Sequence, residues 1–482
     1  MTKPTHPPKP HQPARTTLPK KAKAKGIAKN KPATPSIDLA THPDAAGIDI
    51  GAEECTAALP PGRTAITVRT FSMFTSGLEA LRDWLLEHRI TTVAMESTGN
   101  YWIVLYDILS AVGIEVYLVN ARHVKGVPGK KTDVQDAQWL QQLHSAGLLR
   151  KSFRPSLPIV PLRYLMRHRA ELVSDASKQL QLMIKVLTEL NLKLHHVFSD
   201  IDGMSAQAII DAIIAGERDA DKLIALRDRR CRSPIEAIRE ALRGNYSDAH
   251  LLVLKQSQST WRHLQSSLQE LDIEIAKLAQ AAATPAISAL PTAPAAQHRL
   301  SKNTPQISPF ELGWRYYGVD LSDIDGVSGG LISTLISEVG TRNDLLNNFR
   351  SAEAFSSWLK LSPDNRISGG RVLKAKTRRG KNRMAKALQL AAFGLNRSES
   401  ALGQQLRRLK GKLGKSEAIT AIAHKLARII YGMIRSGKKY DEAEAFRQSP
   451  QNAQRQRRRI EQQAAKLGLK LVPTEAAAPI AA

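Results

Sequence analysis

The sequence predicts an α/β domain, then a long helical segment, then a mainly α-helical C-terminal domain. Three observations predict this order. Strand-like and helical patterns alternate over residues 45–155, apolar residues follow three-four spacing over 160–280, and a second compact helical pattern runs over 308–436. With 482 residues the chain is long enough for two or three domains, each with its own core.

The first domain begins with AAGIDIGAEECTAAL, which predicts a strand, a glycine turn and a second strand. TAITVRTFSM, TTVAMEST and IEVYLVN predict three further strands. Helical spacing occurs in SGLEALRDWLLEHRI, NYWIVLYDILSAVG and KTDVQDAQWLQQLHSAGLL, where Thr132 is the expected N-cap. Strands followed by alternating helices and strands indicate a mixed α/β domain.

The helical segment contains two coiled-coil seams. The first consists of Leu162, Leu165, Leu172, Ala176, Leu180, Met183, Leu187, Leu190, Leu194 and Val197, and the second of Trp261, Leu264, Leu268, Leu271, Ile275 and Leu278. Arg169 takes one position of the first seam. Two long helices are expected to pair within the chain or with another subunit, and residues 199–250 between them are given no chemical role.

The remaining segments read as tails and a linker. Residues 1–44 are rich in lysine and proline and predict a disordered basic tail, which either contacts nucleic acid loosely or keeps the chain soluble. Residues 281–307 predict a linker, and 437–482 a mobile basic tail. Within the C-terminal domain, IDGVSGGLISTLISEVG has the glycine pattern of a helix-hairpin-helix element, whose backbone N–H groups can meet phosphate.

Charge and composition limit the partners. The chain has 70 Lys and Arg against 44 Asp and Glu, a formal charge of +26, which favours a nucleic acid as partner. No apolar run is long enough to span a bilayer, and no signal peptide is recognised, so no membrane partner is expected. Cys55 and Cys231 form neither a disulfide framework nor a zinc pattern, which favours a reducing, cytoplasmic setting.

Four acidic residues stand out in this basic chain. Asp49 lies in the first strand, Glu96 ends a buried strand, and Asp133 and Asp136 begin a helix on one face. Singly, each has an ordinary structural explanation: a turn cap, a strand-end charge, or helix N-terminal charges. Together they can meet at one edge of a sheet, where oxygen ligands suit Mg²⁺ or Mn²⁺. Two such ions would stabilise the attacking and leaving oxygens of a phosphodiester.

Basic residues flank this acidic group and recur in the C-terminal domain. Those expected to bind the nucleic-acid backbone are Lys130, Lys131, Arg366, Arg371, Lys374, Lys376, Arg378, Arg379, Lys381 and Arg383. The segment RISGGRVLKAKTRRGKNRMAK, residues 366–386, contains no acid and predicts a phosphate-binding surface. Ser368 precedes Gly369 and Gly370 there. A serine in such a loop is usually a turn residue, so the local pattern leaves a nucleophilic role open.

Four motifs give the chain a family resemblance. GIDIGAE, AMESTGNYW, LVNARHVKGVPGKKTDVQDAQWL and SWLKLSPDNRISGGRVLKAKTRRGKNRMAKAL resemble the transposases with a DEDD-type RuvC-like domain. That insertion-sequence family includes the pilin-gene inverting recombinase Piv. The resemblance covers roughly residues 45–200 and 318–436. It implies an RNase H/RuvC-like catalytic domain over 45–155 and a C-terminal transposase domain over 308–436.

The resemblance also implies residue roles. Asp49, Glu96, Asp133 and Asp136 match the acidic metal-binding tetrad, and Ser368 matches a serine nucleophile that links covalently to DNA. A serine must be activated, which the acidic group would do in a composite site of both domains. The coiled coil would assemble that site in a homo-oligomer, either a dimer or a tetramer.

Further implications concern partners and location. The family resemblance implies guidance by a structured non-coding RNA that pairs with donor and target DNA, and a place beside the bacterial nucleoid. The chain departs from the family in its long basic tail, in its Ala/Pro-rich segment at 280–306, and at Lys360, which stands where a glycine is expected. These departures weaken the match around Ser368 more than the match of the acidic tetrad.

The leading prediction is therefore a transposase or site-specific recombinase that cleaves and rejoins DNA. A RuvC-like nuclease or junction resolvase would need the acidic tetrad without Ser368. GIDIGA also resembles the first phosphate loop of sugar kinases and actin-like proteins, but their other motifs are not found. A non-enzymatic helical nucleic-acid scaffold would leave Glu96 and the aspartate pair without a role.

Overall fold

The computed structural model describes residues 41–97, 99–120, 132–282, 305, 307–378, 380, 382–446 and 450–469. Most of the predicted N-terminal tail, Lys130, Lys131, Arg379, Lys381 and nearly all of the predicted linker lie outside these residues. The chain forms two compact units, which divide between Ser152 and Phe153. Within the described residues, no helix has the length and apolar character needed to cross a membrane.

The first unit contains a five-stranded sheet of order β3-β2-β1-β4-β5. Its strands are β1 (Ala45–Ile50), β2 (Glu54–Ala58), β3 (Val68–Ser72), β4 (Thr92–Glu96) and β5 (Glu115–Val119). β1, β4 and β5 are parallel, whereas β2 and β3 add antiparallel strands at one side. The predicted mixed α/β domain and its five strands are confirmed.

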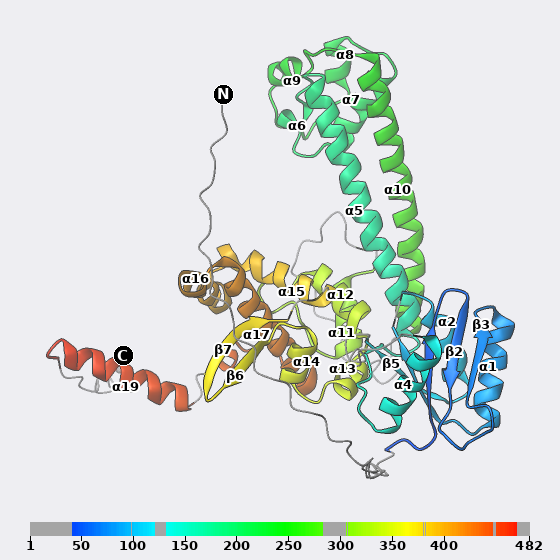
Figure 1. Ribbon diagram of the computed structural model, residues 1–482. Helices are drawn as coiled ribbons and strands as arrows, with labels where there is room; N and C mark the ends of the chain where they lie inside the picture. Colours follow the sequence, from blue (N-terminus) through cyan, green and yellow to red (C-terminus); the bar gives the residue numbers. More distant parts are fainter. Residues whose placement is uncertain are drawn as a thin grey trace, which may run out of the picture. The chain divides into compact units, whose positions relative to one another are not determined.

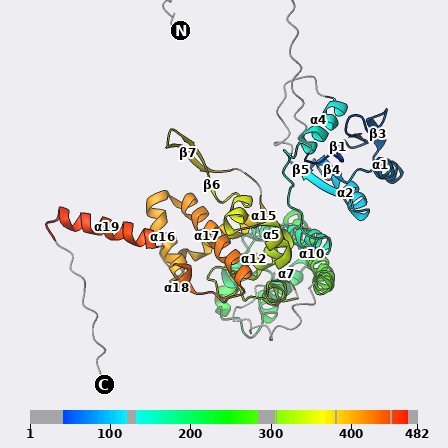
Figure 2. The same ribbon diagram turned by 90° about the horizontal axis from the view of Figure 1, so that it is seen from below.

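Helices cover both faces of this sheet (Figure 2). These are α1 (Thr75–Glu87), α2 (Trp102–Ala111) and α4 (Asp133–Ser145). Ile48 and Met95 point toward the core shared with α1 and α2, while Ala94 packs against Leu140 of α4 on the opposite face. α4 begins as predicted, because the Thr132 hydroxyl accepts a hydrogen bond from the backbone N–H of Gln135 at 3.3 Å.

A buried histidine secures the last turn of α4. The Nε2 atom of His144 lies 2.8 Å from the Thr92 hydroxyl, and its ring centroid lies 4.5 Å from that of Tyr117. Burial, together with the nearby His42, lowers the pKa of His144 to about 4, so its ring is neutral at physiological pH. The C-terminal end of α4 is thus fastened to β4 and β5 by a group that sequence reasoning did not single out.

The second unit begins with a pair of long antiparallel helices, α5 (Ile159–Glu189) and α10 (Asp248–Ala281), which lie side by side (Figure 1). Of the two arrangements left open by the seams, the structure shows pairing within the chain. Four short helices cap the far end around a core of their own: α6 (Leu194–Val197), α7 (Met204–Ile214), α8 (Ala220–Ala225) and α9 (Ile235–Ala241). α7, α8 and α9 occupy the segment 199–250, which had no predicted role, whereas α6 contains Leu194 and Val197, which were wrongly predicted to continue the first seam beyond the end of α5.

The seam between α5 and α10 contains a buried ion pair. The Arg169 guanidinium donates hydrogen bonds to both carboxylate oxygens of Asp272, at 2.5 and 3.1 Å, and both side chains are largely excluded from water. The predicted polar position in the first seam is therefore matched by an acid on the facing helix. Such a pair adds little net stability, but removing one partner leaves an uncompensated buried charge.

The base of the helix pair belongs to the core of the C-terminal domain, where Leu162 and Ile275 are buried among its helices. Glu338, itself buried, holds Arg163 at 3.2 Å and Arg167 at 2.6 Å. The domain's elements are α11 (Pro309–Tyr317), α12 (Gly329–Val339), α13 (Arg342–Asn348), α14 (Ala352–Trp358), β6 (Pro363–Ser368), β7 (Arg371–Thr377), α15 (Arg383–Gly394), η2 (Leu395–Arg397), α16 (Ala401–Leu413), α17 (Lys415–Ser436), α18 (Glu442–Ala445) and α19 (Pro450–Lys466).

Two predicted features of this domain take a definite form. α11 and α12 pack together, and the turn between them includes Gly326, with a φ of 86°, and Ser328, which caps α12. The helix-hairpin-helix assignment of this segment and its phosphate-binding role both stay predictions. Part of the segment predicted as a mobile tail is helical, since α18 and α19 lie within residues 442–466.

Candidate active site

Two of the four acidic residues stand at the ends of adjacent parallel strands. The register pairs Gly47 with Ala94 and Ile48 with Met95, so Asp49 and Glu96 come next on their strands. Residues in register on parallel strands point to the same face, and alternate residues share a face. Because Ala94 packs on the α4 side, Asp49 and Glu96 also lie on that side. Both are partly buried.

Gly47 lets α4 cross β1 in direct backbone contact. A Cβ atom on Gly47 would lie 2.3 Å from both the carbonyl oxygen of Ala137 and the backbone nitrogen of Gln141. The Gln141 side-chain amide donates to the carbonyl oxygen of Ala45 at 3.3 Å. α4 therefore runs antiparallel to β1. Its first turn lies near the C-terminal end of β1, on the side of Asp49.

That first turn holds the other two acids. Asp133 is exposed and lies one helical turn before Ala137, which contacts Gly47, while Asp136 is partly buried and directly precedes Ala137. The structure thus brings all four predicted carboxylates to one end and one face of the sheet. It does not gather them into a closed metal cluster: in the part of the chain that the structure describes, no group of three or more His, Cys, Asp or Glu lies close enough to hold a metal.

The chemistry of these side chains nevertheless fits a hard divalent cation. All four donors are carboxylates, the ligands that Mg²⁺ and Mn²⁺ prefer, and no softer nitrogen or sulfur ligand occurs among them. Carboxylates on one edge also repel each other, which a cation would relieve. Lys130 and Lys131, the predicted phosphate contacts before α4, lie outside the described residues.

Ser368 belongs to the second unit, at the tip of the β6–β7 hairpin. It pairs with Arg371 across Gly369 and Gly370, whose φ angles are 53° and 74°. Two consecutive left-handed residues form the kind of tight turn that joins hairpin strands, and only glycine adopts them without cost. The serine side chain is exposed. The interpretation of Ser368 as a turn residue and its role as an accessible nucleophile are therefore compatible.

The predicted basic surface is partly visible on and beside this hairpin. Arg371, Lys376, Arg378 and Arg383 are exposed, while the side chains of Arg366 and Lys374 lie outside the described part. Arg378 pairs with Asp364 at 3.3 Å and Arg383 with Glu171 at 3.1 Å. Exposed ion pairs of this kind contribute about 0–1 kcal/mol, so both arginines can exchange their carboxylates for phosphate.

Two large apolar side chains near the tip are also exposed. Ile367 is 62% exposed and Leu373 is 70% exposed. The register shifts at Arg366/Ile367, which leaves Leu373 as an extra residue on β7, a bulge of the kind that redirects side chains near active sites. A two-stranded sheet is only marginally stable alone, so the hairpin is suited to being covered by a partner.

Lys360, the departure from the family pattern, has an unusual backbone. Its φ is 59°, in the left-handed region where a side chain is costly and glycine is favoured. Glycine adopts this left-handed conformation without steric cost, which explains why the family pattern has a glycine at this position. The chain retains the local conformation despite the substitution.

A sheet with carboxylates at one edge and a helical domain with exposed basic residues are features compatible with an enzyme that acts on nucleic acid. Residues 46–192 match a family model described as a transposase, of the IS110 DEDD type. Residues 320–406 match the model of the transposase IS116/IS110/IS902 family. No relative is found among curated proteins.

The chain belongs to the IS110 family of DEDD transposases and is an enzyme that acts on DNA. This confirms the resemblance stated from the sequence motifs. It also favours a transposase over the kinase-like and non-enzymatic alternatives. The two matches include Asp49, Glu96, Asp133, Asp136 and Ser368, but leave residues 193–319 and the region after 406 unmatched.

Proposed function

We propose that the first unit is a RuvC-like catalytic domain in which Asp49, Glu96, Asp133 and Asp136 hold Mg²⁺ or Mn²⁺. The observation that carries this proposal is the crossing of α4 over Gly47, which directs the first turn of α4 toward the carboxyl ends of β1 and β4. The strand order and the parallel β1–β4–β5 core support the RuvC-like assignment.

The four carboxylates differ in burial, and we propose different roles for them on that basis. Asp49, Glu96 and Asp136 are partly buried and held by strand and helix, so they orient the site, whereas the exposed Asp133 stands at its rim. When bound, the divalent ions would neutralise charge on a phosphodiester and polarise its oxygens. The formal charge of +26 favours binding of the DNA backbone by the chain as a whole.

In the same proposal Ser368 is the nucleophile. Its Oγ attacks phosphorus and forms a P–O bond, while the bond from phosphorus to one deoxyribose oxygen breaks. The serine proton passes to a base, and the released deoxyribose oxygen takes up a proton. The free deoxyribose hydroxyl of another strand then reverses these steps, which rejoins DNA and releases the serine. The exposed hairpin tip makes the Oγ accessible to DNA.

We further propose that acidic edge and serine act together when the two units meet, within one chain or between subunits. A homo-oligomer, dimeric or tetrameric, assembled through the α5–α10 pair would bring them together, and half-buried seam residues such as Leu165, Leu172 and Leu271 support this. A structured non-coding RNA would select the DNA by base pairing, so that the protein contacts chiefly its shape and backbone.

The test is covalent trapping. Purified protein, Mg²⁺, co-purifying RNA and labelled element-junction DNA are mixed and resolved on a denaturing gel. A protein–DNA adduct is expected for the wild type and for Ser266→Ala, an exposed serine on α10, and is lost in Ser368→Ala. Treatment with ribonuclease before mixing should also remove the adduct; its persistence would contradict RNA guidance.

The alternative is a RuvC-like nuclease or junction resolvase. It predicts metal-dependent nicking that survives Ser368→Ala, with no adduct in any variant. That result would retain the acidic site and reject covalent serine chemistry. The exposed, well-formed hairpin turn favours the transposase with a serine nucleophile over this alternative.

A further inference from the structure

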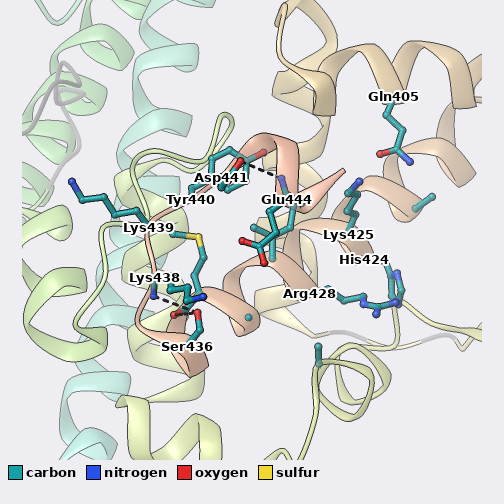
Figure 3. A pocket seen from close by; sticks show the side chains of 16 residues that line it. Gln405, His424, Lys425, Arg428, Ser436, Lys438, Lys439, Tyr440, Asp441 and Glu444 are labelled. Carbon is teal, nitrogen blue, oxygen red and sulfur yellow. Dashed lines mark hydrogen bonds between the residues drawn. The ribbon is translucent and has the colours of Figure 1, made fainter. Parts of the chain in front are cut away.

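A cavity of about 860 Å³ lies in the C-terminal domain, away from the serine hairpin in sequence (Figure 3). α17 contributes His424, Lys425 and Arg428 to its lining, and the segment after α17 contributes Lys438, Lys439 and Tyr440. α16 adds Gln405. Apart from Gln405 and Ala352, the lining lies beyond the region that matches the transposase family.

The lining is cationic. The lining includes four cations, Lys425, Arg428, Lys438 and Lys439, and two acids, Asp441 and Glu444. In Figure 3 the side chain of Lys439 extends away from those of Lys425 and Arg428. The Asp441 carboxylate is already used, because it accepts a hydrogen bond from the backbone N–H of Glu444 at 3.1 Å. The excess of positive charge fits an anion.

Lys425 is the most enclosed of these cations. Its Nζ lies 3.2 Å from the centroid of the Phe446 ring, and burial, with the nearby Arg408, lowers its pKa. Arg428 is oriented by Glu353, at 2.7 Å. Lys425 is therefore held in place by the fold, whereas Arg428 lies at the exposed mouth of the cavity, where Glu353 orients it.

Gly432 gives the cavity an open floor. It lies within α17, near its C-terminal end at Ser436, and glycine inside a helix costs about 1 kcal/mol relative to alanine. A Cβ atom there would meet nothing within 4 Å, so packing within the chain does not require the glycine. A glycine that no neighbour demands leaves room for a ligand to approach the helix backbone.

Two polar atoms of the lining are buried without a hydrogen-bond partner among the described residues: Oε1 of Gln405 and the hydroxyl of Tyr440. Burial, with the nearby Glu442, raises the pKa of Tyr440 to about 12, so the hydroxyl keeps its proton. An unsatisfied buried polar group costs about 1–3 kcal/mol, and a ligand with polar edges would remove part of that cost.

We propose that this cavity binds one nucleotide of a nucleic-acid strand, with its phosphate at Lys425 and Arg428. The base would lie over Gly432, toward Gln405 and Tyr440. The volume falls in the range of small-molecule sites. The proposal rests on the chain's action on DNA and does not depend on covalent chemistry at Ser368. Single-stranded DNA, RNA and a free nucleotide share this chemistry.

The experiment places a large side chain at Gly432, so that it occupies the cavity. Gly432→Leu places a side chain where nothing lies within 4 Å, and Gly411→Leu is the matched control, an exposed helical glycine on α16 that also has open space. Full-length proteins are mixed with fluorescein-labelled 5-iodouracil strands of DNA and of RNA at moderate salt. Affinity is measured by anisotropy, and contacts are mapped by photo-cross-linking and mass spectrometry.

For the wild type and Gly411→Leu, a cross-linked peptide containing Tyr440 is expected. Gly432→Leu should lose that peptide and bind a short strand about tenfold more weakly. Whichever strand carries the cross-link identifies the source as DNA or RNA. Unchanged affinity and cross-linking in Gly432→Leu would overturn the proposal.

A mononucleotide arm separates a strand from a free nucleotide. If nucleoside monophosphates bind wild type, fail to bind Gly432→Leu, and strands bind both equally, the strand assignment is overturned. Trapping with junction DNA is scored separately. Loss of the Ser368 adduct leaves the cavity comparison intact, and loss of the cavity effect leaves the adduct intact, so the two proposals fail independently.

Discussion

The two regions that carry the proposed chemistry are built in opposite ways. The acidic edge is part of a five-stranded sheet, covered by α4 through the direct contact at Gly47, and three of its four carboxylates are partly buried. Ser368 stands on a hairpin of two strands, exposed at the tip, with two glycines as its only turn. The packed core of the sheet therefore fixes the geometry of the acidic edge, whereas the tight Gly369–Gly370 turn fixes that of Ser368.

This difference shows what positions the carboxylates on the one hand and the serine on the other. The carboxylates are oriented before DNA arrives, because strand register and helix crossing fix them. The serine is exposed, and in the proposed mechanism it would be positioned only when a partner covers the hairpin. Substitutions at the acidic edge should therefore affect both stability and activity, whereas substitutions at the hairpin tip should affect activity alone.

The largest expected effect is on the acidic edge. Asp49→Asn keeps the shape but removes a carboxylate charge, and should lower strand cleavage about a thousandfold, equivalent to about 4 kcal/mol. DNA affinity should stay within about twofold, since phosphate contacts are retained. Glu53→Gln, an exposed acid of the β1–β2 turn, is the control and should cleave normally. Normal cleavage by Asp49→Asn would contradict the proposed metal-binding role of the four carboxylates.

Gly47→Ala tests how α4 is placed. The new Cβ would lie 2.3 Å from two backbone atoms of α4, which must move away and carry Asp133 and Asp136 with it. The free energy of unfolding of the first unit should fall by about 3 kcal/mol, and cleavage should fall with it. Gly62→Ala, where only a φ of 80° is strained, should cost about 1 kcal/mol. Chemical denaturation monitored by tryptophan fluorescence measures both.

A pH effect of about 3 kcal/mol is expected from His144. Its pKa is about 4 in the fold against an ordinary 6.5, so the unfolded chain binds the proton more readily between these values. The stability from this group is complete above pH 6.5 and is lost as pH falls toward 4. Denaturation across this range should show the slope, and His144→Gln should reduce it. An equal slope in both proteins would assign it to other groups.

At the hairpin, Gly370→Val should slow adduct formation about tenfold, because a β-branched residue disfavours a φ of 74° by about 1–2 kcal/mol. The midpoint of thermal unfolding should not change, since the hairpin contributes little to the core. Differential scanning calorimetry and the trapping assay together report this. A large drop in the midpoint would show that the hairpin is integral to the domain and would erase the contrast with the acidic edge.

The smallest expected effect is stabilising. Lys360→Gly relieves a left-handed backbone and should raise the unfolding free energy of the second unit by about 0.5–1 kcal/mol. Lys439→Gly is the control. Lys439 is exposed and lies outside any helix, and its backbone φ is not positive, so this variant should give no such gain. Equal changes in the two variants would show that backbone strain at Lys360 is negligible.

The comparison also separates what could be predicted. The strands that carry Asp49 and Glu96 and the cap at Thr132 follow from short-range patterns, and the structure has them where the sequence indicated. The first seam was predicted to continue to Val197, but α5 ends at Glu189, and the coiled coil stays a prediction. His144, Glu338 and the cavity around Gly432 were not found from sequence. Their partners lie far along the chain, as with Thr92 for His144, and no local spacing announces such a pair.

The sequence by itself determined the elements, the family and the identity of the acidic and basic residues, because periodicity, capping and motifs act over neighbouring positions. Only the tertiary structure decided that α4 crosses β1 at Gly47, that α5 and α10 pair within the chain, and that Ser368 stands on an exposed turn. Those outcomes depend on which distant surfaces fit without steric overlap, and close packing between segments is a property that a linear pattern does not contain.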